Sequence, residues 1–458
     1  MEKVKRFIVQ MMAAIATICI YSSCSGDDYI NAIPGNANAL IAVDMKAVGE
    51  KTGNDKGKFV ESLFQVEDIK DCGIDMSGKL FFFETTDGNL GCCAKVADED
   101  NLKDWLNKLA GKAMCDNVKE RRGISYTLLK NSWALCFNDK ALLITGPVLP
   151  AQQAEAIRTM AKCLKQKEED GIKGSPIYEK IDSIGGSVAI VAQVDALPDK
   201  IAAPFTIGAP KGADESQIMI AATMEMNKRG CLTIEGEPFS ANSDIDKALK
   251  EGTAKFRKMN GRFINDMPGK TLCSVFMNVN GKDFVQMMHN STGLGMLLAG
   301  MNTAIDMDNI LRSADGDMAI GVNSYEENNI DMTMAAQLDN QDFLKDVAYW
   351  KKSCPEGSSI ENCGEKSFWF KNGSNSFWFG VSDGNEFYGS TDKELATGIL
   401  KATPSPLPAE VRKVISGQKF CMILNVSRLL EENRELRTVT DVIEPLFGKI
   451  NNVIYCIK

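Results

Sequence analysis

Four segments of this chain recur in the same order at a nearly constant separation of about 240 residues. A period of that length indicates duplicated domains, because the repeats of a solenoid span only about 20–50 residues. Two copies are therefore expected, roughly residues 30–251 and 263–458, with the second copy ending early. The matching segments are Ala42-Val43-Asp44 with Asn278-Val279-Asn280, Ala94 and Leu102-Lys103-Asp104 with Ala336 and Leu344-Lys345-Asp346, Asn131-Ser132-Trp133 with Asn375-Ser376-Phe377, and Gly185 with Gly417.

The apolar pattern inside the first copy predicts its elements. Short apolar runs bounded by Gly, Pro and Asp predict strands over residues 39–44, 79–84, 90–96, 124–129, 133–137 and 141–145. Helical spacing predicts helices over 98–109 and 152–167. This order has the ferredoxin-like β-α-β-β-α-β outline. The expected fold class is α+β, with tandem duplicated domains, each a mainly antiparallel sheet with helices on one face.

The expected domain division follows from the repeat and from the composition of the N-terminus. It consists of a lipoprotein signal peptide at 1–24, a tether at 25–29, a first α+β unit at 30–170, a second unit completing copy one at 171–262, a third unit at 263–400 and a partial fourth unit completing copy two at 401–458.

The N-terminus has the order of a secretory signal. Basic residues at positions 3, 5 and 6 precede an uncharged apolar run from Phe7 to Ile20, and small residues then lead to Cys24. The run is shorter than the roughly 20 residues of a membrane-spanning helix. A cysteine at the cleavage site is typical of a bacterial lipobox, in which the thiol is acylated. We therefore expect Cys24 to anchor the chain in a membrane; the alternative is an ordinary signal peptide with a chance cysteine.

Charge and cysteine content narrow the partners and the redox chemistry. The net charge of -9 argues against nucleic acid as a partner, because phosphate backbones require a basic surface. Most cysteines are expected to be buried free thiols, because several lie in apolar strand-like runs: Cys136, Cys231, Cys273, Cys421 and Cys456. Cys354 and Cys363 flank a short loop and are the one local pair that suggests a disulfide.

Three stretches carry a resemblance to a known family. They are Tyr29-Ile30…Ile33-Pro34 before residues 39–44, Gly73-Ile74-Asp75-Met76-Ser77, and residues 137–143. The sequence resembles the domain-of-unknown-function 4836 family of Bacteroidetes lipoproteins. The resemblance implies a place in the outer membrane or at the cell surface, and Asp27 and Asp28 resemble an export signal that follows the anchor. Because the shared motifs are structural, the resemblance implies no catalytic residue.

Few catalytic or metal-binding arrangements are open to this sequence. His289 is the single histidine, so a catalytic triad or a zinc site drawing on several histidines is not expected. His289 is interpreted as a helix-surface or partly buried residue. Asp306, Asp308, Asp315 and Asp317 lack the spacing of a calcium loop, and the favoured interpretation is a solvated turn before a strand. No cofactor and no metal are expected.

The most suggestive surface feature is an aromatic hairpin over residues 368–379. Period-two alternation places its phenylalanines on one face and Trp369 and Trp378 on the other. A turn at Asn372-Gly373-Ser374-Asn375 would pair the two tryptophans across the strands. They then form either a possible ligand platform, suited to a sugar or a protein partner, or a face covered by helices.

Three functions remain open from the sequence. The preferred one is a lipid-anchored cell-envelope protein acting as a non-enzymatic binding or structural module for an unknown protein or glycan partner. The first alternative is a carbohydrate-active hydrolase whose carboxylate pair the sequence does not reveal. The second is an assembly subunit that docks a partner through its sheet edges.

Overall fold

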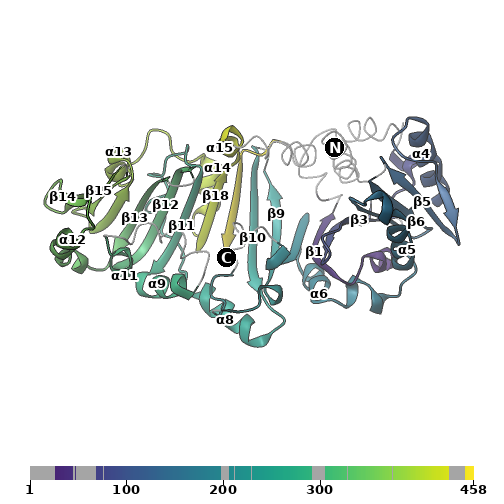
Figure 1. Cartoon of the computed structure of the whole chain (residues 1–458), viewed down its shortest axis with the longest axis horizontal. Coiled ribbons are helices and arrows are strands. Elements are labelled where there is room, and N and C mark those ends of the chain that lie inside the picture. The colour runs from purple at the N-terminus through teal and green to yellow at the C-terminus, as the bar shows by residue number, and fades with distance from the viewer. Residues whose placement is uncertain are drawn as a thin grey trace. The chain divides into compact units, whose positions relative to one another are not determined.

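The computed structural model of this chain describes residues 26–44, 47, 69–75, 77–130, 132–196, 206–210, 212–227, 229–290, 305–326, 329–373, 375–432 and 449–457. These residues form a mixed α/β fold dominated by mostly antiparallel β-sheet, divided into two compact units (Figure 1). The first unit contains the described residues up to 196 together with 219–227. The second contains most of the remaining residues. We call the strands of these units the first and the second sheet.

The first sheet has the strand order β4-β5-β6-β7-β3-β2-β1-β8-β9, with every neighbouring pair antiparallel. The predicted strands are confirmed, and those at 124–129 and 133–137 have the predicted bounds. The strands are β1 (Ala37–Asp44), β2 (Lys79–Thr85), β3 (Leu90–Lys95), β4 (Lys119–Arg121), β5 (Ile124–Leu129), β6 (Trp133–Phe137), β7 (Ala141–Gly146), β8 (Val188–Gln193) and β9 (Met219–Met226).

Helices cover both faces of the first sheet, which corrects the expectation of one covered face. Helix α4 (Glu99–Gly111) begins at Asp98, whose side chain accepts a hydrogen bond from the Asn101 amide, and its apolar stripe packs on Leu135. Helix α5 (Gln153–Cys163) contacts the opposite face, where Met160 Sδ lies 3.9 Å from Cys136 Sγ. Adjacent residues of a strand point to opposite faces, so β6 has apolar side chains on both sides. Helix α6 (Pro176–Ser183) follows α5.

The second sheet has the order β14-β15-β16-β17-β13-β12-β11-β18-β19-β10. All neighbours are antiparallel except β10 and β19, which are parallel. The strands are β10 (Cys231–Phe239), β11 (Cys273–Asn280), β12 (Ala314–Glu326), β13 (Asn329–Leu338), β14 (Ser358–Asn362), β15 (Ser367–Asn372), β16 (Asn375–Val381), β17 (Glu386–Ser390), β18 (Phe420–Asn425) and β19 (Asn452–Ile457).

Helices also lie on both sides of the second sheet (Figure 1). Trp350 of α12 packs against Phe379, whereas Ala396 of α13 belongs to the core on the other face, which Trp378 borders. The helices are α8 (Ser243–Ala254), α9 (Gly281–Asn290), α11 (Met307–Arg312), α12 (Val347–Ser353), α13 (Lys393–Gly398), α14 (Ala409–Ile415) and α15 (Val426–Glu432). Among the described residues, none of the helices combines the length and apolar character needed to span a bilayer.

The two sheets share one strand order. Adding ten to the number of each strand in the first sheet, β1 to β9, gives the order of β11 to β19 in the second. This strand order is not that of a ferredoxin-like unit. A split β-α-β unit would place another strand between the first two strands, but β1 and β2 are direct neighbours, and so are β11 and β12. The four-part division of the chain predicted from the sequence stays a prediction.

The disulfide lies elsewhere than the sequence suggests. Cys354 and Cys363 are free thiols, whereas Cys421 and Cys456, expected to be free, are bonded to each other. The two bonded residues lie directly opposite each other on β18 and β19, with Cα atoms 4.3 Å apart. That pairing joins residues 35 positions apart, so only the assembled sheet reveals it. Cys136 and Cys231 are buried and form no disulfide, as predicted.

Candidate functional site

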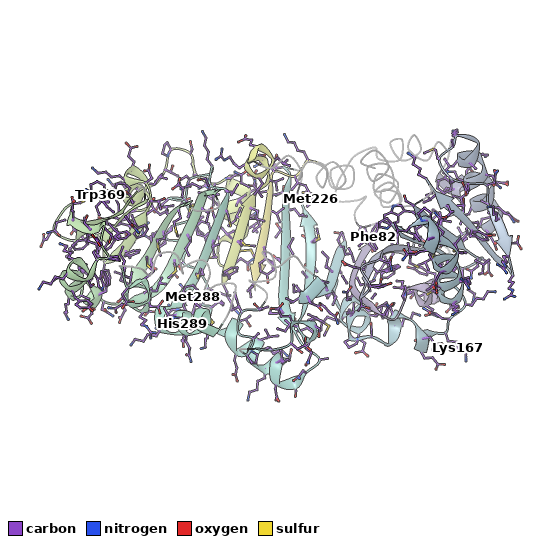
Figure 2. The ribbon with its side chains drawn as sticks, viewed as in Figure 1. Phe82, Lys167, Met226, Met288, His289 and Trp369 are labelled. Atoms are coloured by element: carbon purple, nitrogen blue, oxygen red, sulfur yellow. A yellow bond between two sulfur atoms is a disulfide. The ribbon has the colours of Figure 1, made fainter. Side chains whose placement is uncertain are left out.

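The aromatic hairpin forms as predicted at the β14–β15 end of the second sheet (Figure 2). In the register of β15 and β16, Trp369 lies opposite Trp378, and the phenylalanines lie opposite each other. Phe368, Phe377 and Phe379 are buried on the face that α12 covers. The alternation of strand side chains therefore determines which face each aromatic residue occupies.

The two tryptophans stack on each other and are half-buried. Their ring centroids lie 5.3 Å apart with an interplanar angle of 11°. Trp378 also packs against the core beneath α13, while Lys371 Nζ lies 3.5 Å from the centroid of the Trp369 ring. A flat ligand that stacked on Trp369 would have to compete with this lysine for the ring. Ligand binding by this tryptophan pair stays a prediction, and the stacked arrangement of the two rings defines the surface that a ligand would meet.

The same unit also contains a charged cluster, centred on Arg262, that the sequence did not predict. Arg262 donates from Nε and Nη2 to the two carboxylate oxygens of Glu386, at 2.5 and 2.9 Å, and from Nη1 to Asp266 at 2.5 Å. The Asp266 and Glu386 side chains are only 7% and 13% exposed. The hydrogen bond to Glu386 raises the pKa of Arg262 despite partial burial. This cluster ties the segment before β11 to β17.

The acidic residues around position 310 do not act as one group. Asp306 caps α11 by accepting from the Asn309 amide, and the Asp308 carboxylate accepts a hydrogen bond from Nε2 of His289 on α9 at 2.6 Å. Asp315 pairs with Arg257 at 2.6 Å. Among the residues that the structure describes, no group of three or more His, Cys, Asp or Glu side chains is arranged to hold a metal ion.

The interpretation of a solvated turn is wrong for Asp317. This residue lies inside β12 and is 4% exposed. Its carboxylate accepts hydrogen bonds from the amides of Asn260 and Arg262 and from Asn278 Nδ2, at 3.0, 2.9 and 2.8 Å. These three donors replace the water that burial removes.

Two further residues singled out from the sequence are His289 and Cys24. His289 lies on α9 (Figure 2). Its side chain is 57% exposed. Cys24, the predicted lipidation site, lies outside the described residues.

The fold and these side chains define the class of the protein: a mixed α/β protein dominated by mostly antiparallel β-sheet, with an aromatic hairpin in its second unit. The chain belongs to the DUF4836 family, described as a domain of unknown function, whose family model matches residues 29–405. No curated protein matches the chain. Two solved structures, crystal forms I and III of TP0453, are similar to it at a TM-score of 0.24 and 8% identity, covering 82% of this chain and 100% and 99% of theirs.

Proposed function

We propose that this chain is a lipid-anchored protein of the cell envelope that acts as a non-enzymatic binding or structural module. The basic, apolar and small-residue order that ends at Cys24 supports the anchor. The family match begins at residue 29, which agrees with a short tether between the anchor and the first domain. The acidic residues Asp27 and Asp28 support a location at the outer membrane or cell surface.

We also propose that the two sheets are copies of one domain. The shared strand order supports this, and so does a matching detail before the first strand of each sheet. Pro34 forms an isolated bridge with Gly171, and Pro268 forms one with Pro406. The following residues, Gly35 and Gly269, both approach carbonyl oxygens of the bridged segment so closely that a Cβ would lie 3.1 and 2.7 Å from them.

The strand registers support a slightly different alignment of the copies from the one in the sequence. Asp44 of β1 corresponds to Asn278 of β11 when Pro34 is placed on Pro268. Their cross-strand partners, Lys79 of β2 and Asp317 of β12, then correspond to each other. In the same way Gln337 corresponds to Lys95. The alignment of Ala94 with Ala336 is kept.

The observation that carries the binding role is a difference between the copies. The cross-strand pair Trp369 and Trp378 in the second sheet occupies the positions of Leu128 and Ala134 in the first. A stacked aromatic pair exposes more flat ring surface than the two aliphatic side chains do. A binding site that arose in one copy would produce this difference, whereas a shared core position would keep its bulk.

The anchor is tested by replacing Cys24. Cys24→Ala should abolish acylation and move the protein from the membrane fraction to the soluble fraction, because the thiol is the attachment point of the lipid. Mass spectrometry of the purified N-terminus and fractionation of cells measure the two effects. Cys363→Ala, which replaces an exposed free thiol, is the matched control and should leave the protein in the membrane. Unchanged partitioning of Cys24→Ala would refute the anchor.

The platform is tested by acrylamide quenching and unfolding of Trp369→Ala. The other three tryptophans, at positions 105, 133 and 350, are buried, so a quenchable fraction of the fluorescence reports on Trp369 and Trp378. We expect the variant to lose the part of that fraction that Trp369 contributes. We also expect it to lose about 1–2 kcal/mol of stability, the size of a lost aromatic contact plus partial burial.

Leu128→Ala, at the corresponding position of the first copy, is the control and should leave the quenching unchanged. A loss of about 3–5 kcal/mol in Trp369→Ala, with tryptophans that acrylamide does not reach in the unaltered protein, would mean that the pair is core.

A further inference from the structure

Exposed cations gather at one side of the first unit, on β4, on the turn after it and around the C-terminal end of α5. Their side chains form no ion pair among the described residues, and we call them the basic patch: Lys119, Arg121, Arg122, Lys162 and Lys165. Lys165 Nζ donates to the Arg122 carbonyl at 2.7 Å. The end of α5 therefore lies against the turn between β4 and β5, and the five cations belong to one surface.

The strand registers place the β4 part of the patch on the face that α5 covers. Lys119 lies opposite Tyr126, and Tyr126 lies opposite Cys136, which α5 contacts. Residues directly opposite each other share a face, and so do residues two positions apart in one strand. Lys119 and Arg121 therefore both point to the α5 side. Glu120, between them, points to the other side, where it pairs with a lysine of α4 at 3.0 Å.

The first described helix, η1 (Asp27–Ala32), lies on the same face as the patch. Cys93 Sγ of β3 donates to the Tyr29 carbonyl at 3.4 Å, and the registers through β7 put Cys93 on the face of Cys136. Four interstrand steps of about 4.8 Å separate β3 from β4. The patch therefore begins within roughly 20 Å of η1, measured along the sheet.

The chain that joins η1 to the proposed anchor is short. Only Ser25 separates Cys24 from Gly26, and two residues span at most about 7 Å. Gly26, Asp27 and Asp28 are exposed, so the chain leaves the fold at the surface. A lipid on Cys24 would therefore hold the headgroup layer close to η1, and the basic patch lies beside η1 on the same face.

The carboxylates of this region do not cancel the patch. Three of them are neutralised in ion pairs: Asp28 with Lys140, Glu169 with Lys167 and Glu168 with Lys173. Glu155 and Arg158, three positions apart on α5, offset each other. Asp27, Asp139 and Asp170 form no ion pair among the described residues, but the five cations outnumber them. Because the whole chain has a net charge of -9, anionic lipids repel most of its surface, and the patch decides which face approaches them.

We propose that the basic patch docks on the anionic headgroups of the membrane that holds the anchor. The α5 face of the first unit then lies against the bilayer, and the α4 face points away from it. This inference rests on the lipid anchor proposed above: the anchor supplies proximity, and the patch supplies orientation. Each lysine or arginine near an anionic surface favours the docked state by about fivefold.

The test is lysine labelling on vesicles. The complete acylated protein is reconstituted into vesicles of phosphatidylcholine, with or without phosphatidylglycerol, and mass spectrometry follows the reaction of each lysine with an amine reagent. Lys119 and Lys162 should react at least about fivefold more slowly on the vesicles with phosphatidylglycerol. Lys108, exposed on α4, should react equally on both. About 1 M salt should remove the difference, because it screens the attraction.

The double variant Arg121→Gln, Arg122→Gln should react at Lys162 about as fast on anionic vesicles as on neutral ones. Its melting temperature should not change, because both arginines are exposed and form no ion pair among the described residues. The matched control is Lys108→Gln, Lys401→Gln, which removes the same number of exposed cations outside the patch and should keep the protection of Lys162.

Equal labelling of Lys162 on the two kinds of vesicle, protection of Lys108 as well, or protection that survives the loss of both arginines would each overturn the docking. Flotation with the neutral vesicles measures the anchor separately, because the patch has no attraction to an uncharged surface. A protein that floats without protection of Lys162 retains the anchor and refutes the docking, whereas a protein that does not float refutes the anchor itself.

Discussion

Replacing Arg262 with alanine is expected to lower the free energy of unfolding by about 2–4 kcal/mol. The change leaves the carboxylates of Asp266 and Glu386 buried without their shared cation, and an uncompensated buried charge costs more than the pair contributes. The guanidinium is 31% exposed, so solvent screening keeps the effect below that of a fully buried pair. Denaturant unfolding followed by circular dichroism measures the loss.

Arg257→Ala is the matched control, because Arg257 forms a single ion pair with Asp315 in which both side chains are more than a third exposed. Its cost should stay below about 1 kcal/mol. Glu386→Gln in the Arg262→Ala background should restore part of the lost stability by removing one orphaned charge. Equal effects of the two arginine changes would contradict a structural role for the Arg262 cluster.

Removing the bond between Cys421 and Cys456 is expected to cost about 2–4 kcal/mol of stability. The bond closes a separation of 35 residues, and a cross-link of that span restricts the unfolded chain substantially. The double variant Cys421→Ala, Cys456→Ala should therefore unfold at lower denaturant concentration. Reduction of the unaltered protein should shift the midpoint in the same direction.

The double variant Cys354→Ala, Cys363→Ala is the control, because both thiols are free. It should keep the midpoint of the unaltered protein and contain two fewer titratable thiols. If instead the control loses stability, and the Cys421 and Cys456 variant does not, the chain is cross-linked at the loop that the sequence suggested.

The sequence was most informative about local structure. The bounds of β5 and β6 follow from apolar runs between turn residues, and the cap of α4 follows from Asp98 and the acidic residues after it. The opposite faces of Trp369 and Phe368 follow from the pleat of a single strand. Each of these features depends on residues a few positions apart, whose geometry the backbone itself imposes.

The repeat was visible as well, but its alignment was not. The sequence comparison placed Ala42-Val43-Asp44 on Asn278-Val279-Asn280, whereas the registers of β1 with β2 and of β11 with β12 favour placing Asp44 on Asn278. Register depends on which side chains meet across two strands, and a shift of two residues keeps the same face buried. The sequence of one strand therefore leaves such a shift undetermined.

What the sequence by itself determined is the family, the order and type of the elements, and the faces on which their side chains lie. Only the tertiary structure decided that helices cover both faces of each sheet, that Cys421 pairs with Cys456, that Arg262 joins Asp266 to Glu386, and that Asp317 is buried with three hydrogen-bond donors. The physical reason is the same for all four. Each depends on contacts between segments that are distant in the chain, and such contacts are selected by packing and by compensation of buried charge, not by local periodicity.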